Sequence, residues 1–117
     1  MIKQHDKKIL RTMRHKRIRG KIAGTATRPR IAVFRSLTSV SVQAINDELG
    51  RTLVAAALSE VNKAKNDIAG ATAVGELLGK RLKEQKIDIA VFDRAGYKYH
   101  GRVKALAEGV RSQGVTM

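Results

Sequence analysis

The window from residue 93 to residue 102 holds side chains that could bind nucleic acid. It contains both tyrosines of the chain, one of its three histidines and several cationic side chains. These residues are Arg94, Tyr97, Lys98, Tyr99, His100 and Arg102. Nucleic-acid bases stack on tyrosine, histidine and arginine planes, at about 1–3 kcal/mol per base. Gly96 and Gly101 allow the backbone to approach a sugar-phosphate chain closely. The loop therefore favours RNA contact, although one of the two tyrosines could instead cover the end of the following helix with its hydroxyl group outward.

A second candidate group lies at the end of the first predicted strand, where Arg35 and Ser36 stand. If the fourth predicted strand is parallel to the first, both strands end at the same edge of the sheet. We then expect Arg35, Thr38 and Ser39 to lie beside the Tyr97 loop. The alternative for Arg35 is a surface salt bridge, which contributes little to stability.

Residues for catalysis are scarce. Two of the three histidines, His5 and His15, lie near the start of the chain, and no zinc-protease motif, nucleophile elbow or phosphate-binding glycine loop is present. A metal-dependent nuclease needs several carboxylates at strand ends, whereas the first predicted strand ends in Arg35. We therefore expect a protein that is not an enzyme and that has no metal, no cofactor and no small-molecule substrate.

Positive charge is concentrated at the start of the chain. Residues 1–30 hold 11 Lys and Arg but one acid, and so carry +10 of the +14 formal charge, while residues 31–117 carry +4. A helix over about residues 7–19 is possible, but like-charge repulsion predicts that it frays in water and becomes ordered on contact with phosphates. A tail that only improves solubility and a mitochondrial presequence are the alternatives to a nucleic-acid-binding arm.

Composition narrows the class of protein further. The chain has 117 residues, of which 43% are apolar, as in an ordinary folded domain. The absence of cysteine excludes disulfides and thiolate metal sites. No apolar run approaches the roughly 20 residues of a membrane span, so we expect no membrane partner. With a sequence pI of about 10.8, the expected partner is a polyanion.

Hydrophobic periodicity predicts an α/β fold, in which helices pack on a mixed four-stranded sheet with the element order β-β-β-α-β-α. The first three strands form an antiparallel meander, although the alanines of the third also allow a helix. The fourth is nearly all apolar and is therefore expected at the centre of the sheet. The predicted strands cover residues 31–35, 40–45, 51–58 and 87–92, and the predicted helices cover residues 66–85 and 102–111.

The longer predicted helix is amphipathic, with Asn66 or Asp67 as its cap. Its expected apolar stripe consists of Ile68, Ala71, Val74, Leu78 and Leu82. Three glycines inside it, at positions 70, 75 and 79, are expected to permit close packing against the sheet. In the shorter helix the residues expected to face inward are Val103, Leu106, Ala107 and Val110, with Gly114 just past its end.

We expect two regions, a basic RNA-binding arm over residues 1–27 that is flexible when free, and an α/β RNA-binding body over residues 28–117. The sequence Gly24-Thr25-Ala26-Thr27, followed by Arg28-Pro29, is interpreted as a hinge between them. Glycine is conformationally permissive, and the residue before a proline is held extended.

Two motifs carry a resemblance to a known family. The first is Arg28-Pro-Arg-Ile-Ala-Val-Phe-Arg-Ser36, preceded by Gly24-Thr25-Ala26, and the second is Phe92-Asp-Arg-Ala-Gly-Tyr-Lys-Tyr-His-Gly-Arg-Val-Lys-Ala-Leu-Ala107. Together they resemble the bacterial large-subunit ribosomal protein family numbered eighteen, the 5S-rRNA binder. The resemblance covers essentially the whole chain, including the arginine-rich arm.

The resemblance implies a structural protein of the large ribosomal subunit, in the cytoplasm, that binds 5S rRNA and helps attach it to 23S rRNA in the central protuberance. It implies neighbouring ribosomal proteins as further partners, and a fourth strand beside the first. The residues on which RNA contact would fall are Arg11, Arg14, Arg17, Arg19, Lys21, Arg28, Arg30, Arg35, Ser36, Arg94, Tyr97, Tyr99, His100 and Arg102.

The chain departs from the family pattern after Ser36. Ser39 and Ser41 stand where the family usually carries larger side chains, so stacking or hydrogen bonds made by those larger side chains do not carry over to this chain. The chain also ends in Met117 where the family often ends in Phe, which we expect to affect packing only. A basic DNA-binding module and a small nuclease of related topology are the alternative functions.

Overall fold

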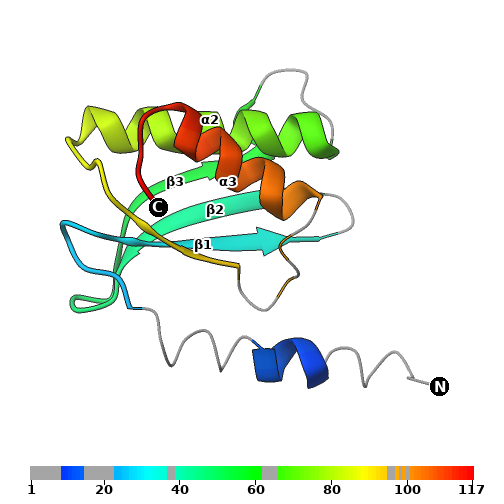
Figure 1. Cartoon of the computed structure of the whole chain (residues 1–117), viewed down its shortest axis with the longest axis horizontal. Coiled ribbons are helices and arrows are strands. Elements are labelled where there is room, and N and C mark those ends of the chain that lie inside the picture. Colours follow the sequence, from blue (N-terminus) through cyan, green and yellow to red (C-terminus); the bar gives the residue numbers. More distant parts are fainter. Residues whose placement is uncertain are drawn as a thin grey trace.

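The computed structural model describes residues 9–14, 23–36, 39–61, 66–94, 97, 99 and 101–117. These residues form the α/β fold that the sequence predicts, with two helices packed on a four-stranded sheet (Figure 1). The elements are β1 (Arg30–Arg35), β2 (Val40–Asn46), β3 (Arg51–Ala57), the 3₁₀ turn η1 (Leu58–Glu60), α2 (Ile68–Glu84), β4 (Val91–Asp93) and α3 (Arg102–Ser112). Residues 9–14 of the basic arm are helical, and the remainder of the helix expected over residues 7–19 lies outside the described residues.

The sheet has the mixed topology that the sequence predicts. Its strand order is β3-β2-β1-β4. β1 and β2 are antiparallel, β2 and β3 are antiparallel, and β4 is parallel to β1. The alanine-rich third segment is therefore a strand, and the α2 connection carries the chain back to the edge next to β1.

The fourth strand differs from its prediction in length and in position. Only residues 91–93 are a strand, and they lie at an edge of the sheet and not at its centre. The preceding residues pair with the end of the chain, because Ala90 N–H donates to the carbonyl of Thr116, and Thr116 N–H donates to that of Asp88. This C-terminal segment covers part of the apolar run over residues 87–92. Ala90 is therefore only 1% exposed, although among the described residues no second strand of the sheet lies on that side.

The hydrophobic core lies between the sheet and the two helices. Alternation along β1 and β2 places Ile31, Val33, Val40 and Val42 in this layer, each at most 1% exposed. Full burial of such a side chain stabilises the fold by about 1.5–3 kcal/mol relative to exposure.

The helices contribute the other side of the core, largely as predicted. In α2, four of the five stripe residues are fully buried, whereas Ile68 is 59% exposed, because it is the first residue of the helix. In α3, all four predicted inward residues are fully buried. The predicted cap of α2 is confirmed, since the carboxylate of Asp67 accepts a hydrogen bond from Gly70 N–H at 2.8 Å.

Glycines bring the two helices together, and not a helix and the sheet as expected. A Cβ atom on Gly75 would overlap the carbonyl oxygen of Leu106, and one on Gly109 would overlap the carbonyl oxygen of Thr72. The two helix backbones therefore approach each other at a reciprocal pair of glycines. The predicted packing against the sheet is wrong for Gly75, because α3 occupies the space next to it.

The expected hinge at residues 24–29 is fixed to the body. Gly24 N–H donates to the carboxylate of Asp47 at 2.6 Å, and Asp47 N–H donates to the carbonyl of Gly24 at 3.0 Å. Thr25 and Arg28 close a turn, in which Thr25 N–H donates to the Arg28 carbonyl. A side chain on Gly24 would overlap the Ile45 carbonyl, so this glycine serves close packing and not flexibility.

Side chains from the last turn of α2 and from its C-cap residue also reach the outermost strand, β3. The guanidinium of Arg81 donates to the carbonyl of Ala55 at 2.6 Å, and the amide of Gln85 donates to that of Leu53 at 3.4 Å. α2 is therefore bound to the sheet by polar contacts at its edge as well as by the core beneath it.

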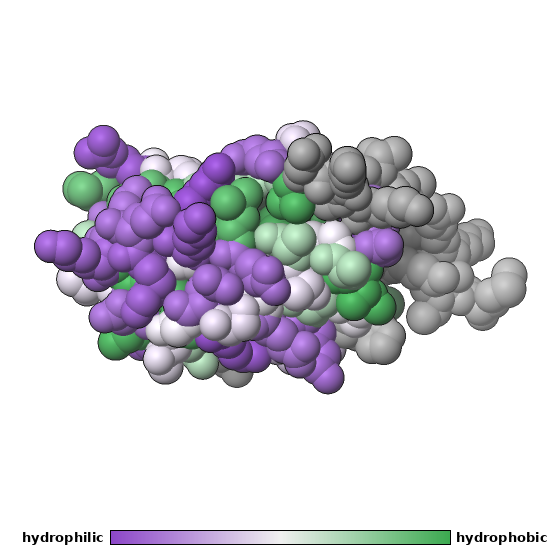
Figure 2. Space-filling view, turned by 90° about the horizontal axis from the view of Figure 1, so that it is seen from above, coloured by the Kyte–Doolittle hydropathy of each residue, from purple (hydrophilic) through white to green (hydrophobic). Residues whose placement is uncertain are grey.

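The outer surface of the helical layer is mostly hydrophilic. Figure 2 shows this side from above, with the densest hydrophilic surface at the left of the view, near the C-terminal end of α2. Exposed residues there include Lys83, Glu84, Gln85 and Lys86. Within the described part of the chain, neither α2 nor α3 is long and apolar enough to cross a membrane.

Candidate nucleic-acid interface

Three segments meet where β1 ends. The hydroxyl of Tyr97, from the loop after β4, donates a hydrogen bond to the carbonyl of Arg35 at 3.1 Å. The guanidinium of Arg102, at the start of α3, donates to the carbonyl of Ser36 at 3.2 Å. The parallel pairing of β1 and β4 produces this meeting, and it confirms the prediction that Arg35 lies beside the Tyr97 loop. Thr38, expected in the same place, lies outside the described residues.

Tyr97 holds two arginine side chains by its ring. The guanidinium carbon of Arg35 lies 4.8 Å from the ring centroid, and that of Arg11, in the arm, lies 4.7 Å from it. Cation–π contacts of this kind orient a guanidinium without neutralising its charge. Residues far apart in the sequence therefore place two positive charges at one edge of the sheet.

Tyr99 has a different environment from Tyr97. Its ring makes an edge-to-face contact with Phe92, with centroids 6.0 Å apart. Its hydroxyl accepts a hydrogen bond from the guanidinium of Arg111 at 2.8 Å, and 41% of its surface is exposed. These contacts match the alternative in which one tyrosine covers a helix with its hydroxyl at the surface.

Arg30 lies inside the molecule, between two carboxylates. Its guanidinium contacts Asp47 at 3.0 Å and Asp93 at 2.8 Å, and its side chain is 11% exposed. Burial lowers the pKa of Arg30, but hydrogen bonds and attraction from Asp47 and Asp93 outweigh it, so the pKa lies above its ordinary value. This ion network joins β1, β4 and the turn after β2.

Sequence reasoning placed Arg30 among the RNA-contacting residues and missed its two acids. Asp93 pairs with Ala32 across β1 and β4. Arg30 pairs with Ile45 across β1 and β2, and Asp47 is two residues after Ile45 in the sequence. Both acids were visible in the sequence as the end of a strand and the start of a turn. Only the strand register brings them to one guanidinium.

The other predicted contact residues have different surroundings. Arg11, Arg28, Arg35 and Ser36 are exposed, while Arg14, Arg94 and Arg102 are half-buried. Arg102 also donates to the side chain of Asn66. The structure does not describe four of the predicted residues, namely Arg17, Arg19, Lys21 and His100.

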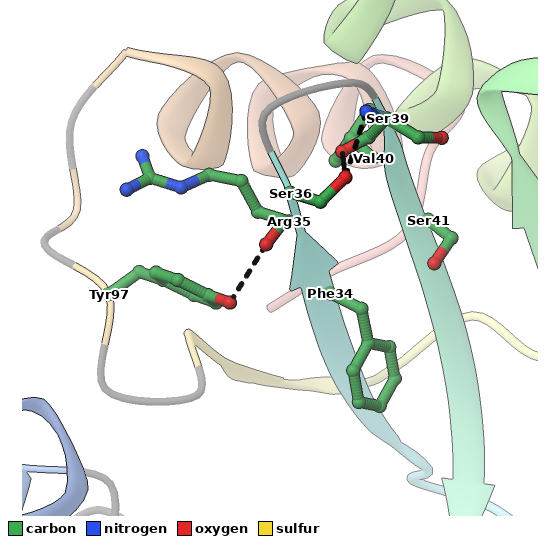
Figure 3. Close-up of a pocket in the computed structure, with 7 residues that line it drawn as sticks. All are labelled: Phe34, Arg35, Ser36, Ser39, Val40, Ser41 and Tyr97. Carbon is green, nitrogen blue, oxygen red and sulfur yellow. Dashed lines mark hydrogen bonds between the residues drawn. The ribbon is translucent and has the colours of Figure 1, made fainter. Parts of the chain in front are cut away.

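Arg11, Arg35, Tyr97 and Arg102 form what we call the cationic edge. Beside it is a shallow hollow, which the sequence analysis did not identify. Its volume is about 250 Å³, and it is lined by Phe34, Arg35, Ser36, Ser39, Val40, Ser41 and Tyr97 (Figure 3). Phe34 is 48% exposed, although it belongs to β1. The alternation of β1 was the available signal, because it directs Phe34 to the face opposite Ile31 and Val33.

The site contains the groups that bind an anionic polymer. Guanidinium groups attract phosphates, and aromatic rings are surfaces for bases. Within the part of the chain that the structure describes, no cluster of three or more histidines or acids is placed to hold a metal ion.

Comparisons with known proteins agree with this description. The family model described as ribosomal L18 of archaea, bacteria, mitochondria and chloroplast matches residues 5–117. Proteins named "Large ribosomal subunit protein uL18" are similar over 98% of both chains. Identity is 50% to the protein of Desulforamulus reducens, 49% to that of Solibacter usitatus and 52% to that of Pelotomaculum thermopropionicum.

Proposed function

Because this chain belongs to the ribosomal L18 family, we propose that it binds 5S rRNA and helps attach it to 23S rRNA in the central protuberance of the large subunit. Family membership makes it a structural, non-catalytic component of the large ribosomal subunit. Its location is accordingly the ribosome in the bacterial cytoplasm. The specific RNA partners, and contact with neighbouring ribosomal proteins, belong to the proposal.

The observation that carries the proposal is the cationic edge at Tyr97. Arg35 from β1 and Arg11 from the arm lie over one ring, and Arg102 is bound beside them. Such an edge binds phosphates without reading sequence, and RNA offers it a distorted or single-stranded backbone.

The proposed interface combines this edge with the basic arm over residues 1–27. Phosphate contacts supply most of the affinity, and the Tyr97 loop selects the shape of the RNA. Arg30 is expected to act indirectly, by holding β1 in place. Tyr99 is likewise expected to act through its contacts with Phe92 and Arg111. The proposed contact residues are Arg11, Arg14, Arg17, Arg19, Lys21, Arg28, Arg35, Ser36, Arg94, Tyr97, His100 and Arg102.

Binding to a 5S rRNA transcript over a series of salt concentrations tests the function. The full chain should bind with a steep salt dependence, and a chain without residues 1–20 should bind more weakly. Each phosphate contact adds about 0.7–0.9 to the logarithmic slope, so losing four contacts flattens it by about 3.

The matched comparison is duplex DNA of similar length as a competitor. Poor competition by this DNA at physiological salt supports the proposal. Equal competition would indicate a general basic module, and an unchanged salt slope after the deletion would exclude the arm from the interface.

A further inference from the structure

Phe34 is an aromatic side chain in an unusual position. It is the next-to-last residue of β1, yet almost half of its surface is exposed. The helices cover the other face of the sheet, where Ile31 and Val33 are fully buried. An exposed ring on a fixed strand is a rigid, flat apolar surface.

Small side chains next to Phe34 create the hollow. Ser41 is directly opposite Phe34 in the β1–β2 register. Figure 3 shows the ring of Phe34 between Tyr97 on one side and Ser41 on the other. The hollow of about 250 Å³ lies below the roughly 300–1,000 Å³ of pockets for drug-sized ligands, so it suits a smaller planar group.

The walls of the hollow are fixed before any ligand arrives. Ser36 and Ser39 close a turn, in which Ser36 N–H donates to the Ser39 carbonyl at 2.8 Å and Ser39 N–H donates to the Ser36 hydroxyl at 3.0 Å. Tyr97 is held by its hydrogen bond to the Arg35 carbonyl. A preformed site of this kind binds without a large ordering cost.

Charge around the hollow selects the ligand. Arg35 lines it, and Arg11 lies over the same Tyr97 ring. A ligand that fits is therefore flat and apolar on its faces, polar at its edges, and attached to an anionic chain. An unpaired nucleic-acid base has all of these properties.

We propose that one unpaired base of the bound RNA enters this hollow and stacks on Phe34, within hydrogen-bonding reach of the Ser41 hydroxyl. The inference rests on the proposed RNA binding and adds a single-base site to it. It also assigns stacking to Phe34, because Tyr97 already carries two guanidinium groups and Tyr99 contacts Phe92 and Arg111.

Three variants of the full chain test this site with 5S rRNA as the probe. Phe34→Ala removes the ring, Phe34→Leu keeps an apolar side chain without a flat face, and Ser41→Phe fills the hollow. We expect Phe34→Ala to weaken binding by about 5- to 140-fold, the range measured for base–aromatic stacking. Phe34→Leu and Ser41→Phe should also weaken binding to 5S rRNA. None of the three substitutions should change the salt slope.

Leu49→Ala is the matched control, because Leu49 is another exposed apolar side chain, at the turn between β2 and β3 and outside the hollow. Circular dichroism verifies that each variant folds. Base-specific chemical probing of the RNA should reveal one unpaired base that the unmodified chain protects and that Phe34→Ala and Ser41→Phe expose.

The outcomes separate the two proposals. Failure of the unmodified chain to bind 5S rRNA would overturn the proposed function. Normal binding by folded Phe34→Ala and Ser41→Phe, with the same bases protected, would overturn the single-base site and leave the proposed function intact. Full affinity of Phe34→Leu would exclude stacking as the source of the effect.

Discussion

Arg30 and Arg35 lie at the two ends of one strand and have opposite surroundings. Arg30 lies between Asp47 and Asp93 and is nearly buried, whereas Arg35 is exposed and lies over the ring of Tyr97. The strand supplies the same residue type at both ends. The difference shows that the neighbouring elements decide whether an arginine stabilises the fold or presents charge to a ligand.

Removing Arg30 should have the largest effect on the molecule. Arg30→Ala removes the guanidinium that pairs with Asp93, which is fully buried. Breaking a buried pair by removing one member costs about 3–5 kcal/mol of unfolding free energy. Urea denaturation followed by circular dichroism measures this loss.

Arg35→Ala is the control at the other end of the strand. We expect it to change the unfolding free energy by less than about 0.5 kcal/mol, as is usual for surface substitutions, and to weaken 5S rRNA binding. Equal destabilisation by the two substitutions would contradict the distinction between the ends of β1.

The two tyrosines provide a second, smaller test. Tyr97→Ala removes the ring that orients Arg35 and Arg11, and cation–π contacts contribute about 0.5–2 kcal/mol each. For a loss in this range we expect 5S rRNA affinity to fall by about 2- to 30-fold at constant salt slope, because no charge is lost.

Tyr99→Ala should instead reduce stability, because it loses the contact with Phe92 and the hydrogen bond from Arg111. Thermal unfolding and RNA titration of both variants distinguish these effects. Loss of affinity from Tyr99→Ala alone, in a folded and stable protein, would reverse the roles given to the two rings.

Arg81 is a third arginine to compare with Arg30 and Arg35, and we expect its ion pair to have the smallest effect on stability. Arg81 forms a surface ion pair with Glu60, and the hydrogen bond from Arg81 lowers the pKa of Glu60 below its ordinary value of 4.5. Stability from this pair is therefore complete above pH 4.5 and decreases as the pH falls through the lowered pKa.

Exposed ion pairs contribute about 0–1 kcal/mol to the free energy of unfolding, far less than we expect from the ion pairs of Arg30. Glu60→Gln should lower stability slightly at pH 6 and reduce the loss of stability on acidification. Urea denaturation at several pH values tests this, and a large drop at pH 6 would contradict the surface character of the pair.

Local patterns in the sequence predicted most of the fold. A short apolar run identified β1, alternation identified β2, the apolar spacing identified α2 and α3, and Asp67 was one of two candidate caps for α2. The expected parallel pairing of the first and fourth strands was enough to place Arg35 next to Tyr97. These features depend on short-range spacing and on one topological rule.

Features that depend on long-range register were missed. The acids around Arg30, the meeting of Gly75 with Gly109, and the cover that Thr116 gives to the segment before β4 each join residues far apart in the chain. Burial of an arginine follows from which residues the register places opposite it, and no local period of hydrophobicity contains that information.

Part of each margin of the sheet is covered by the chain itself. Arg81 and Gln85 bind carbonyl groups of β3, and the segment around Thr116 pairs with the residues just before β4. Unpaired margins are templates on which copies of a protein add strands and aggregate. These contacts therefore leave fewer backbone groups at the margins for a second copy of the chain to pair with.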